Sequence, residues 1–232
     1  MTEYEARYEI TSRALGYVGI QEGSTLHKFL IDQYNKIRPL PRAYEMKTSD
    51  PWCAAFISAI AYMCNMLSII PAECSCEEMI AGFKMIGCWY EADDYMPRLG
   101  DIIFYDWQDS GKGECTGAAD HVGIVTKVYE ESFVVTEGNY SDAVKNRELK
   151  KNARYIRGFG LPDYSAWAQR WNEKNGQTGE RPSSWAAAAV AWAYENGISD
   201  GLRLQQNITR EEAMTMIYRY HLNFGGPHNE SK

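Results

Sequence analysis

The chain has 232 residues, of which 45% are hydrophobic and 24% are charged. These are ordinary globular values, so they exclude a disordered or low-complexity chain, and the length predicts one large domain or a medium domain with a small addition. The 24 lysines and arginines against 31 aspartates and glutamates give a net charge of −7. Such a chain repels a phosphate backbone, and we expect no nucleic-acid partner.

No apolar run approaches the roughly 18 to 20 residues that span a bilayer. The opening MTEYEARYEI carries three glutamates where a secretory signal carries basic and then apolar residues. We therefore expect a protein that is made in the cytoplasm without a signal peptide and has no membrane partner.

The first hundred residues are typical of helices. Apolar residues recur at helical spacing over residues 3–17 and 24–37, which predicts two helices. Asp50 and Pro51 resemble an N-cap and a first helical residue, so a buried helix is expected to start at Pro51.

The pattern changes after Gly100. The segments DIIFYDW, HVGIVTKVY, SFVVTEG and RYIRGFG are short and rich in β-branched and aromatic residues, which predicts the strands of an antiparallel sheet. Helices followed by strands indicate an α+β fold.

The sheet pattern ends at Pro162, so we assign residues 1–164 to a first domain. Residues 165–182 are mainly polar and predict a linker with at most one helical turn, around Trp167 and Trp171. Residues 183–232 predict a helical hairpin whose first helix starts near Trp185. About fifty residues make a small core, so this hairpin is expected to dock on the first domain, to form a homodimer or to bind a partner.

The cysteines and histidines lack the spacings of a zinc site. No metal and no cofactor is expected. Cysteines outside the candidate site are interpreted as buried small hydrophobic residues: Cys64, Cys74, Cys76, Cys88 and Cys115.

Four residues form the candidate catalytic site. Cys53 lies in the first turn of the predicted buried helix, where free N–H groups and the helix dipole lower a thiol pKa. His121 begins a strand and is placed to take the thiol proton. Glu137 and Asn139 follow on the next strand, where we expect both on one face and able to orient the imidazole. Taken alone, a buried cysteine is usually a packing residue and a histidine at a strand start usually a structural one.

The motifs DPWCAAF, GDIIFYDW, DHVGIV and TEGN occur in an order and at spacings that resemble the CHAP family of cysteine, histidine-dependent amidohydrolases and peptidases. The resemblance covers about residues 5 to 162 and implies a papain-like fold with N-terminal helices packed on an antiparallel sheet. It implies that Cys53 is the nucleophile, His121 the base and Glu137 the main orienting residue, with Asn139 in support. It also implies that bacterial peptidoglycan is the substrate.

Aromatic residues near these motifs are candidates to line a substrate cleft: Trp52, Trp107, Tyr105 and Tyr140. For Trp52, beside the nucleophile, a place in the core is an equal alternative. Some CHAP proteins bind calcium just upstream of the nucleophile. Here that stretch offers only Glu45 and Asp50, which are too few oxygens for a hard cation. We interpret Asp50 instead as the helix cap.

The segments WAAAAVAWAYENGISDG and ITREEAMTMIYR resemble an S-layer homology motif, which binds cell-wall polysaccharide in other proteins. The resemblance implies that Arg210 and Trp185 contact the wall, Arg210 through its bidentate guanidinium. The motif departs from the usual pattern, because LRLQQN replaces its turn and a single copy is present. A docking or dimerisation hairpin is the alternative.

Together these features predict a peptidoglycan hydrolase, an endolysin of bacteriophage type or an autolysin, that acts on the wall after its release. The preferred reaction is that of an N-acetylmuramoyl-L-alanine amidase. One alternative is an endopeptidase that cuts within stem or cross-bridge peptides. Another, of a different class, is a non-catalytic wall-binding or assembly module.

Overall fold

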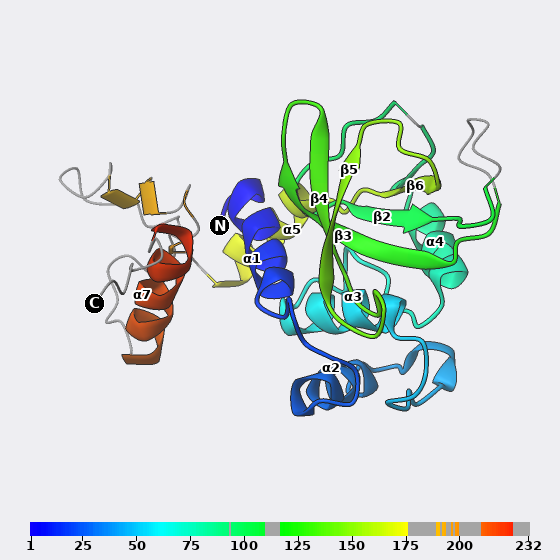
Figure 1. Ribbon diagram of the computed structural model, residues 1–232, viewed down its shortest axis with the longest axis horizontal. Helices are drawn as coiled ribbons and strands as arrows, with labels where there is room; N and C mark the ends of the chain where they lie inside the picture. Colours follow the sequence, from blue (N-terminus) through cyan, green and yellow to red (C-terminus); the bar gives the residue numbers. More distant parts are fainter. Residues whose placement is uncertain are drawn as a thin grey trace, which may run out of the picture.

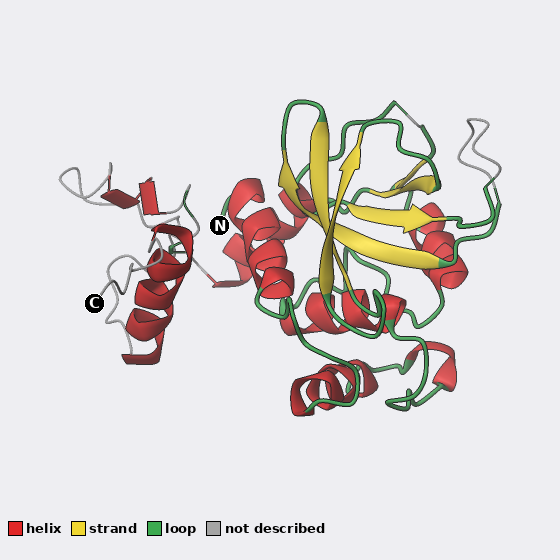
Figure 2. Cartoon of the chain, in the orientation of Figure 1, coloured by secondary structure: helices red, strands yellow, loops and turns green. Residues whose placement is uncertain are grey.

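The computed structural model describes residues 1–92, 94–109, 117–175 and 210–224, with a few positions between 189 and 199. It is an α+β fold in which N-terminal helices pack on an antiparallel sheet (Figures 1 and 2). The arrangement is consistent with a papain-like CHAP fold, so the expected fold class is confirmed.

Helices α1 (Glu3–Leu15) and α2 (Thr25–Asn35) begin and end close to the predicted limits. Both start at a side-chain cap: the Thr2 hydroxyl accepts a hydrogen bond from the Glu5 N–H, and the Ser24 hydroxyl accepts one from His27. A short 3-10 turn, η1 (Pro41–Ala43), follows.

Helix α3 (Cys53–Met63) starts two residues later than expected, so Asp50 is not its cap. The Asp50 carboxylate instead accepts hydrogen bonds from the Lys47 N–H and the Tyr44 hydroxyl, which close the preceding turn. The first helical bond joins the N–H of Phe56 to the carbonyl of Trp52 at 2.8 Å. The N–H groups of the first turn therefore lack acceptors within the helix, and Cys53 is its first residue.

Six strands form one sheet, in the order β1-β6-β2-β3-β4-β5, and every neighbouring pair is antiparallel. The bounds are β1 (Trp89–Tyr90), β2 (Ile102–Tyr105), β3 (His121–Val128), β4 (Ser132–Glu137), β5 (Lys145–Lys150) and β6 (Ile156–Gly160). The sequence patterns predicted β2, β3, β4 and β6. Strand β5 reads KNRELK and is half exposed at the sheet edge, so it lacks the apolar alternation that marks the others.

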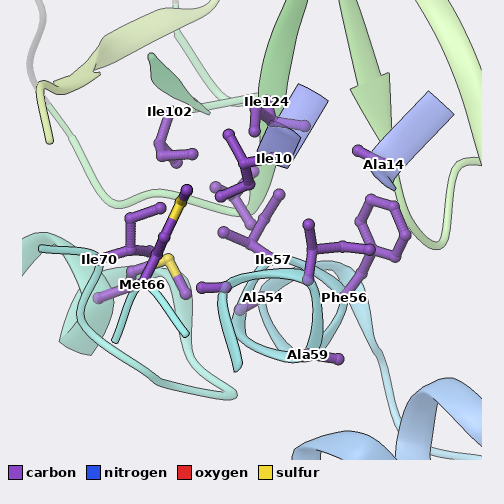
Figure 3. Packing of buried hydrophobic residues seen from close by; sticks show 14 of the residues in the cluster. Ile10, Ala14, Ala54, Phe56, Ile57, Ala59, Met66, Ile70, Ile102 and Ile124 are labelled. Carbon is purple, nitrogen blue, oxygen red and sulfur yellow. The ribbon is translucent and has the colours of Figure 1, made fainter. Parts of the chain in front are cut away.

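Side chains alternate between the two faces of the sheet. Ile102 and Ile124 pack with Ile10 of α1 and Ile57 of α3 in the main core (Figure 3). A second, smaller cluster of buried hydrophobic residues, Phe133 among them, covers the other face of the sheet. Helix α2 packs against α3, and α4 (Cys76–Met85) lies further along the chain.

The segment after Pro162 differs from the expected linker, because α5 (Tyr164–Asn175) is a helix of 12 residues. It packs against α1. The Tyr164 hydroxyl donates to the Gly100 carbonyl at 2.7 Å, and the Trp167 indole donates to the Asn65 carbonyl at 3.0 Å. Both aromatic side chains are buried, and this burial explains why a polar segment folds onto the first domain.

Helix α7 (Arg210–Phe224) is the second helix that the hairpin prediction required. Trp185 and most of the first helix lie outside the described residues, so the hairpin as a whole stays a prediction. Within the described part of the chain, no helix has the length and apolarity needed to cross a membrane.

Candidate active site

Three of the four candidate residues come together where α3, β3 and β4 meet. Cys53 is the first residue of α3, His121 the first of β3 and Glu137 the last of β4. Strands β3 and β4 are neighbours, and α3 packs against β3. The His121 Nε2 and the Glu137 Oε2 lie 3.1 Å apart.

The surroundings of Cys53 favour a thiolate. A hydrogen bond from Cys76 lowers the pKa of Cys53, and this effect outweighs burial, which raises it. Hydrogen bonding and charge from His121, together with the backbone N–H of Ala54, hold the Cys53 pKa well below its usual range. These contacts favour the negative sulfur that a nucleophile requires.

His121 is correspondingly held as an imidazolium. Burial lowers its pKa, but hydrogen bonds and charge from Cys53 and Glu137 outweigh burial and raise the His121 pKa to about 9. Its Nε2 is directed at Glu137, which leaves Nδ1 for the sulfur. A thiolate beside an imidazolium is the ground state of cysteine hydrolases that use a Cys-His pair.

Glu137 is fully buried, and its carboxylate is surrounded by donors. The Tyr105 hydroxyl donates to Oε1 at 2.9 Å. Arg147 forms a bidentate fork, with Nε at 2.7 Å from Oε1 and Nη2 at 3.0 Å from Oε2. Burial raises the Glu137 pKa, and the bonds to His121 and Arg147 overcome it and lower that pKa overall. Glu137 is thus an ionised anchor for the imidazole.

Sequence reasoning missed Arg147, and it took Tyr105 for a cleft residue and not for a partner of Glu137. Tyr105 stands in the quoted motif GDIIFYDW, but its place opposite His121 in the β2–β3 register comes from the structure. Arg147 lies on the strand that no hydrophobic pattern revealed, and it pairs with Val135 of β4. No spacing rule joins it to Glu137.

Two of the aromatic candidates, Trp107 and Tyr140, lie beside this charge network. Trp107 is 37% exposed and stacks on Tyr105, with ring centroids 4.9 Å apart. The Arg147 guanidinium lies 5.1 Å from the Trp107 ring and 4.1 Å from that of Tyr140. Trp107 and Tyr140 therefore border the group formed by His121, Glu137 and Arg147.

Trp52 takes the core alternative, and Asn139 is placed differently from expectation. Trp52 is fully buried, and its indole donates to Glu22 at 3.0 Å, so it belongs to the core and not to a cleft wall. Strand β4 ends at Glu137, and Asn139 lies in the following turn with a φ of 57°. The two residues therefore do not share a strand face, because the turn takes Asn139 out of the pleat.

Among the remaining cysteines, Cys76 is buried as expected but lies in the site, with its sulfur 3.7 Å from that of Cys53. Cys64 is also buried, Cys74 and Cys88 are half-buried, and all are free thiols. Cys115 lies outside the described residues.

The described residues contain no group of three or more His, Cys, Asp or Glu side chains arranged to hold a metal ion. Glu45 and Asp50 are both exposed or partly exposed, and the Asp50 carboxylate is occupied by Lys47 and Tyr44.

Residues 45–139 match the family model of the CHAP domain, and this match supports a CHAP-domain protein. The matched region contains Cys53, His121 and Glu137, the three residues that the geometry brings together. A CHAP domain indicates amidase or peptidase activity of the peptidoglycan-hydrolase type at the level of the family. No curated protein and no solved structure matches the chain significantly.

Proposed function

We propose that this protein is a cysteine-dependent peptidoglycan hydrolase that acts as an N-acetylmuramoyl-L-alanine amidase. The observation that carries the proposal is the continuous chain of interactions from Cys53 through His121 to Glu137, with its perturbed thiol and imidazole pKa values. Perturbed titratable groups that share one site are typical of catalytic centres.

The chemistry follows from these groups. The Cys53 thiolate attacks the amide carbonyl, and N–H groups of the first turn of α3 stabilise the oxyanion. The His121 imidazolium protonates the departing amine, and His121 then acts as the base for the water that hydrolyses the thioester. Glu137 stays ionised throughout and holds the ring in place.

The substrate surface of the proposal is the rim formed by Trp107 and Tyr140. Their aromatic faces suit the apolar faces of sugar rings and peptide groups, and both lie next to the charge network. For the C-terminal part we propose that Arg210, which is exposed at the start of α7, contributes with Trp185 to binding of a wall polysaccharide. A role as a phage endolysin fits this combination of modules.

The test uses purified sacculi and the full chain. Wild type is expected to release new amino groups, and Cys53→Ala is expected to lower the rate at least about 1000-fold, because removal of a nucleophile eliminates the covalent path. Cys64→Ala, a core cysteine, serves as the matched control and should retain activity. Lysis by Cys53→Ala at the wild-type rate overturns the hydrolase proposal and favours a non-catalytic wall-binding module.

Mass spectrometry of the released fragments identifies the bond. Free L-alanine amino termini support the amidase, whereas new D-amino acid termini assign an endopeptidase. Comparison with casein as substrate shows whether the enzyme is selective for the wall.

A further inference from the structure

Two cysteines face each other at the nucleophile. The Cys53 and Cys76 sulfurs are 3.7 Å apart, and both side chains are buried, 7% and 8% exposed. Each is the first residue of its helix, α3 and α4. In the hydrolysis derived above only the Cys53 sulfur forms a covalent bond, and Cys76 contributes no more than its hydrogen bond to the thiolate.

The separation suits a covalent bond between the two sulfurs. A disulfide requires about 2.05 Å, so the atoms need to approach each other by less than 2 Å. Cysteines at helix starts reach this by turning the side chains, because the first residue of a helix has no preceding turn to obstruct it.

We propose that Cys53 and Cys76 form a reversible disulfide when the enzyme meets a hydroperoxide, with Cys76 as the resolving thiol. The Cys53 thiolate attacks one peroxide oxygen and breaks the O–O bond, which gives a Cys53 sulfenic acid and hydroxide. The Cys76 sulfur then attacks the oxidised sulfur. The sulfenic oxygen departs with the Cys76 proton as water, so the two thiols supply the two electrons that reduce the peroxide.

The electrostatics of the pair order these two steps. The hydrogen bond to the Cys53 thiolate, together with burial, raises the Cys76 pKa, so Cys76 stays protonated while Cys53 is reduced. Oxidation of Cys53 removes the negative charge and with it the main cause of that raised pKa. Cys76 is thus a better nucleophile after Cys53 has reacted than before, although burial still raises its pKa.

The disulfide protects the Cys53 sulfur from irreversible oxidation. A lone nucleophilic thiolate proceeds from sulfenic to sulfinic acid, which is irreversible. A neighbouring thiol captures the first stage as a disulfide that reductants reverse. The loss of activity on oxidation rests on the proposed hydrolase function. Disulfide formation itself does not, because it needs only the two thiols and the peroxide.

The test treats the full chain with hydrogen peroxide and measures intact mass, peptide maps and activity before and after dithiothreitol. Wild type is expected to lose two hydrogens, to yield a linked Cys53–Cys76 peptide, to lose activity and to regain most of it on reduction. Cys76→Ala is expected to gain two oxygens on Cys53 and to recover less than a tenth of its activity. Cys74→Ala, which removes the half-buried cysteine two residues away, is the matched control and should behave as wild type.

Cys76→Ser is a second variant, and circular dichroism of both confirms that the fold is retained. A sulfinic acid in wild type without the linked peptide, or a disulfide from Cys53 to a different cysteine, overturns the proposal. So does reversible inactivation of Cys76→Ala. The mass readout needs no substrate, so failure of the hydrolase proposal and failure of this one are told apart.

Discussion

At the scale of single residues, the site is organised around the Glu137 carboxylate. A buried carboxylate without partners would take up a proton, because burial disfavours its charge. Here Tyr105, Arg147 and His121 all interact with it. Together with Cys53, the charge that Glu137 retains raises the His121 pKa. The hydrogen bond to His121 also orders the ring.

The pH dependence follows from the His121 pKa of about 9, which is raised from the ordinary 6.5. Above that pH the imidazolium loses its proton, so the leaving amine has no acid and the thiolate loses its counter-charge. We expect kcat/KM for amino-group release to stay level from pH 7 to 8.5 and to fall above about 9. A fall centred near 6.5 contradicts the thiolate–imidazolium pair.

The same shift affects stability. A histidine whose pKa is raised on folding stabilises the fold fully below its unfolded pKa, and that contribution is lost as the pH rises through its folded pKa. The window here runs from about 6.5 to about 9. Urea unfolding at pH 7 and pH 9.5 measures this loss, and His121→Gln should remove the pH dependence that His121 contributes.

Arg147 offers a second prediction at this scale. Arg147→Met leaves the buried Glu137 carboxylate without its fork, which costs about 1–3 kcal/mol. We expect kcat/KM to fall about 10- to 100-fold, at 1.36 kcal/mol per tenfold. The fall in kcat/KM at high pH should also move to higher pH. Without the positive charge of Arg147 beside it, the Glu137 carboxylate stabilises the imidazolium more strongly.

Lys150→Met is the matched control. Lys150 is exposed at the far end of the same strand, where it pairs with Ser132, and its loss removes the same charge away from Glu137. We expect less than a twofold effect, as is usual for an exposed cation. Equal effects of the two variants would show that Arg147 acts through its charge alone and does not position Glu137.

At the scale of elements, the close approach of β3 to β4 brings His121 within hydrogen-bond distance of the Glu137 carboxylate. Gly123 on β3 permits this approach, because a Cβ there would overlap Val135 and lie 2.8 Å from the Glu137 Cγ. The start of α3 supplies the thiol from the helical layer. The site therefore depends on the register of one strand pair against one helix end.

Gly123→Ala is expected to strain this strand pair. Overpacking of this kind costs about 1–3 kcal/mol, and it pushes Glu137 away from His121. We expect a lower Tm and a larger loss of kcat than of substrate affinity. Gly16→Ala is the control, since its Cβ would lie 3.4 Å from the Arg13 carbonyl oxygen, and it should change Tm little. Unchanged kinetics in Gly123→Ala would show that the strand pair tolerates the added methyl group.

At the scale of the whole molecule, α5 closes the first domain. Its Asn172 Oδ1 accepts a hydrogen bond from the N-terminal amine of Met1 at 2.6 Å, so the two ends of this unit are joined. Arg7 of α1 lies 4.6 Å from the Tyr164 ring. The packed unit therefore extends at least through α5.

Two truncations test this boundary. A chain of residues 1–175 is expected to keep wild-type Tm within a few degrees and to hydrolyse soluble muropeptides at the wild-type rate. A chain of residues 1–162 loses the buried Tyr164 and Trp167 and should unfold at a much lower temperature. Binding to pelleted walls, compared for the full chain and residues 1–175, measures the contribution of the C-terminal part. Equal binding would overturn its proposed role.

Local patterns determined much of the fold and the core of the candidate site. Helical spacing marked α1 and α2, β-branched runs marked the central strands, and a cysteine at a helix start with a histidine at a strand start marked the chemistry. These features are readable because each depends on neighbours within a few positions along the chain. The helix expected at Pro51 is present but starts at Cys53. The expected linker is a helix whose Tyr164 and Trp167 bond to the first domain, and this tertiary contact is not visible in the local pattern.

The amino-acid sequence by itself thus determined the α+β class, and it predicted Cys53, His121 and Glu137 as nucleophile, base and orienting acid. Only the tertiary structure decided that Arg147 clamps Glu137, that Cys76 faces Cys53, that Trp52 is buried and that α5 completes the first domain. Residues 53 and 76, or 137 and 147, meet because of sheet order and helix packing. Such proximity follows from how distant segments pack together, and no local periodicity records it.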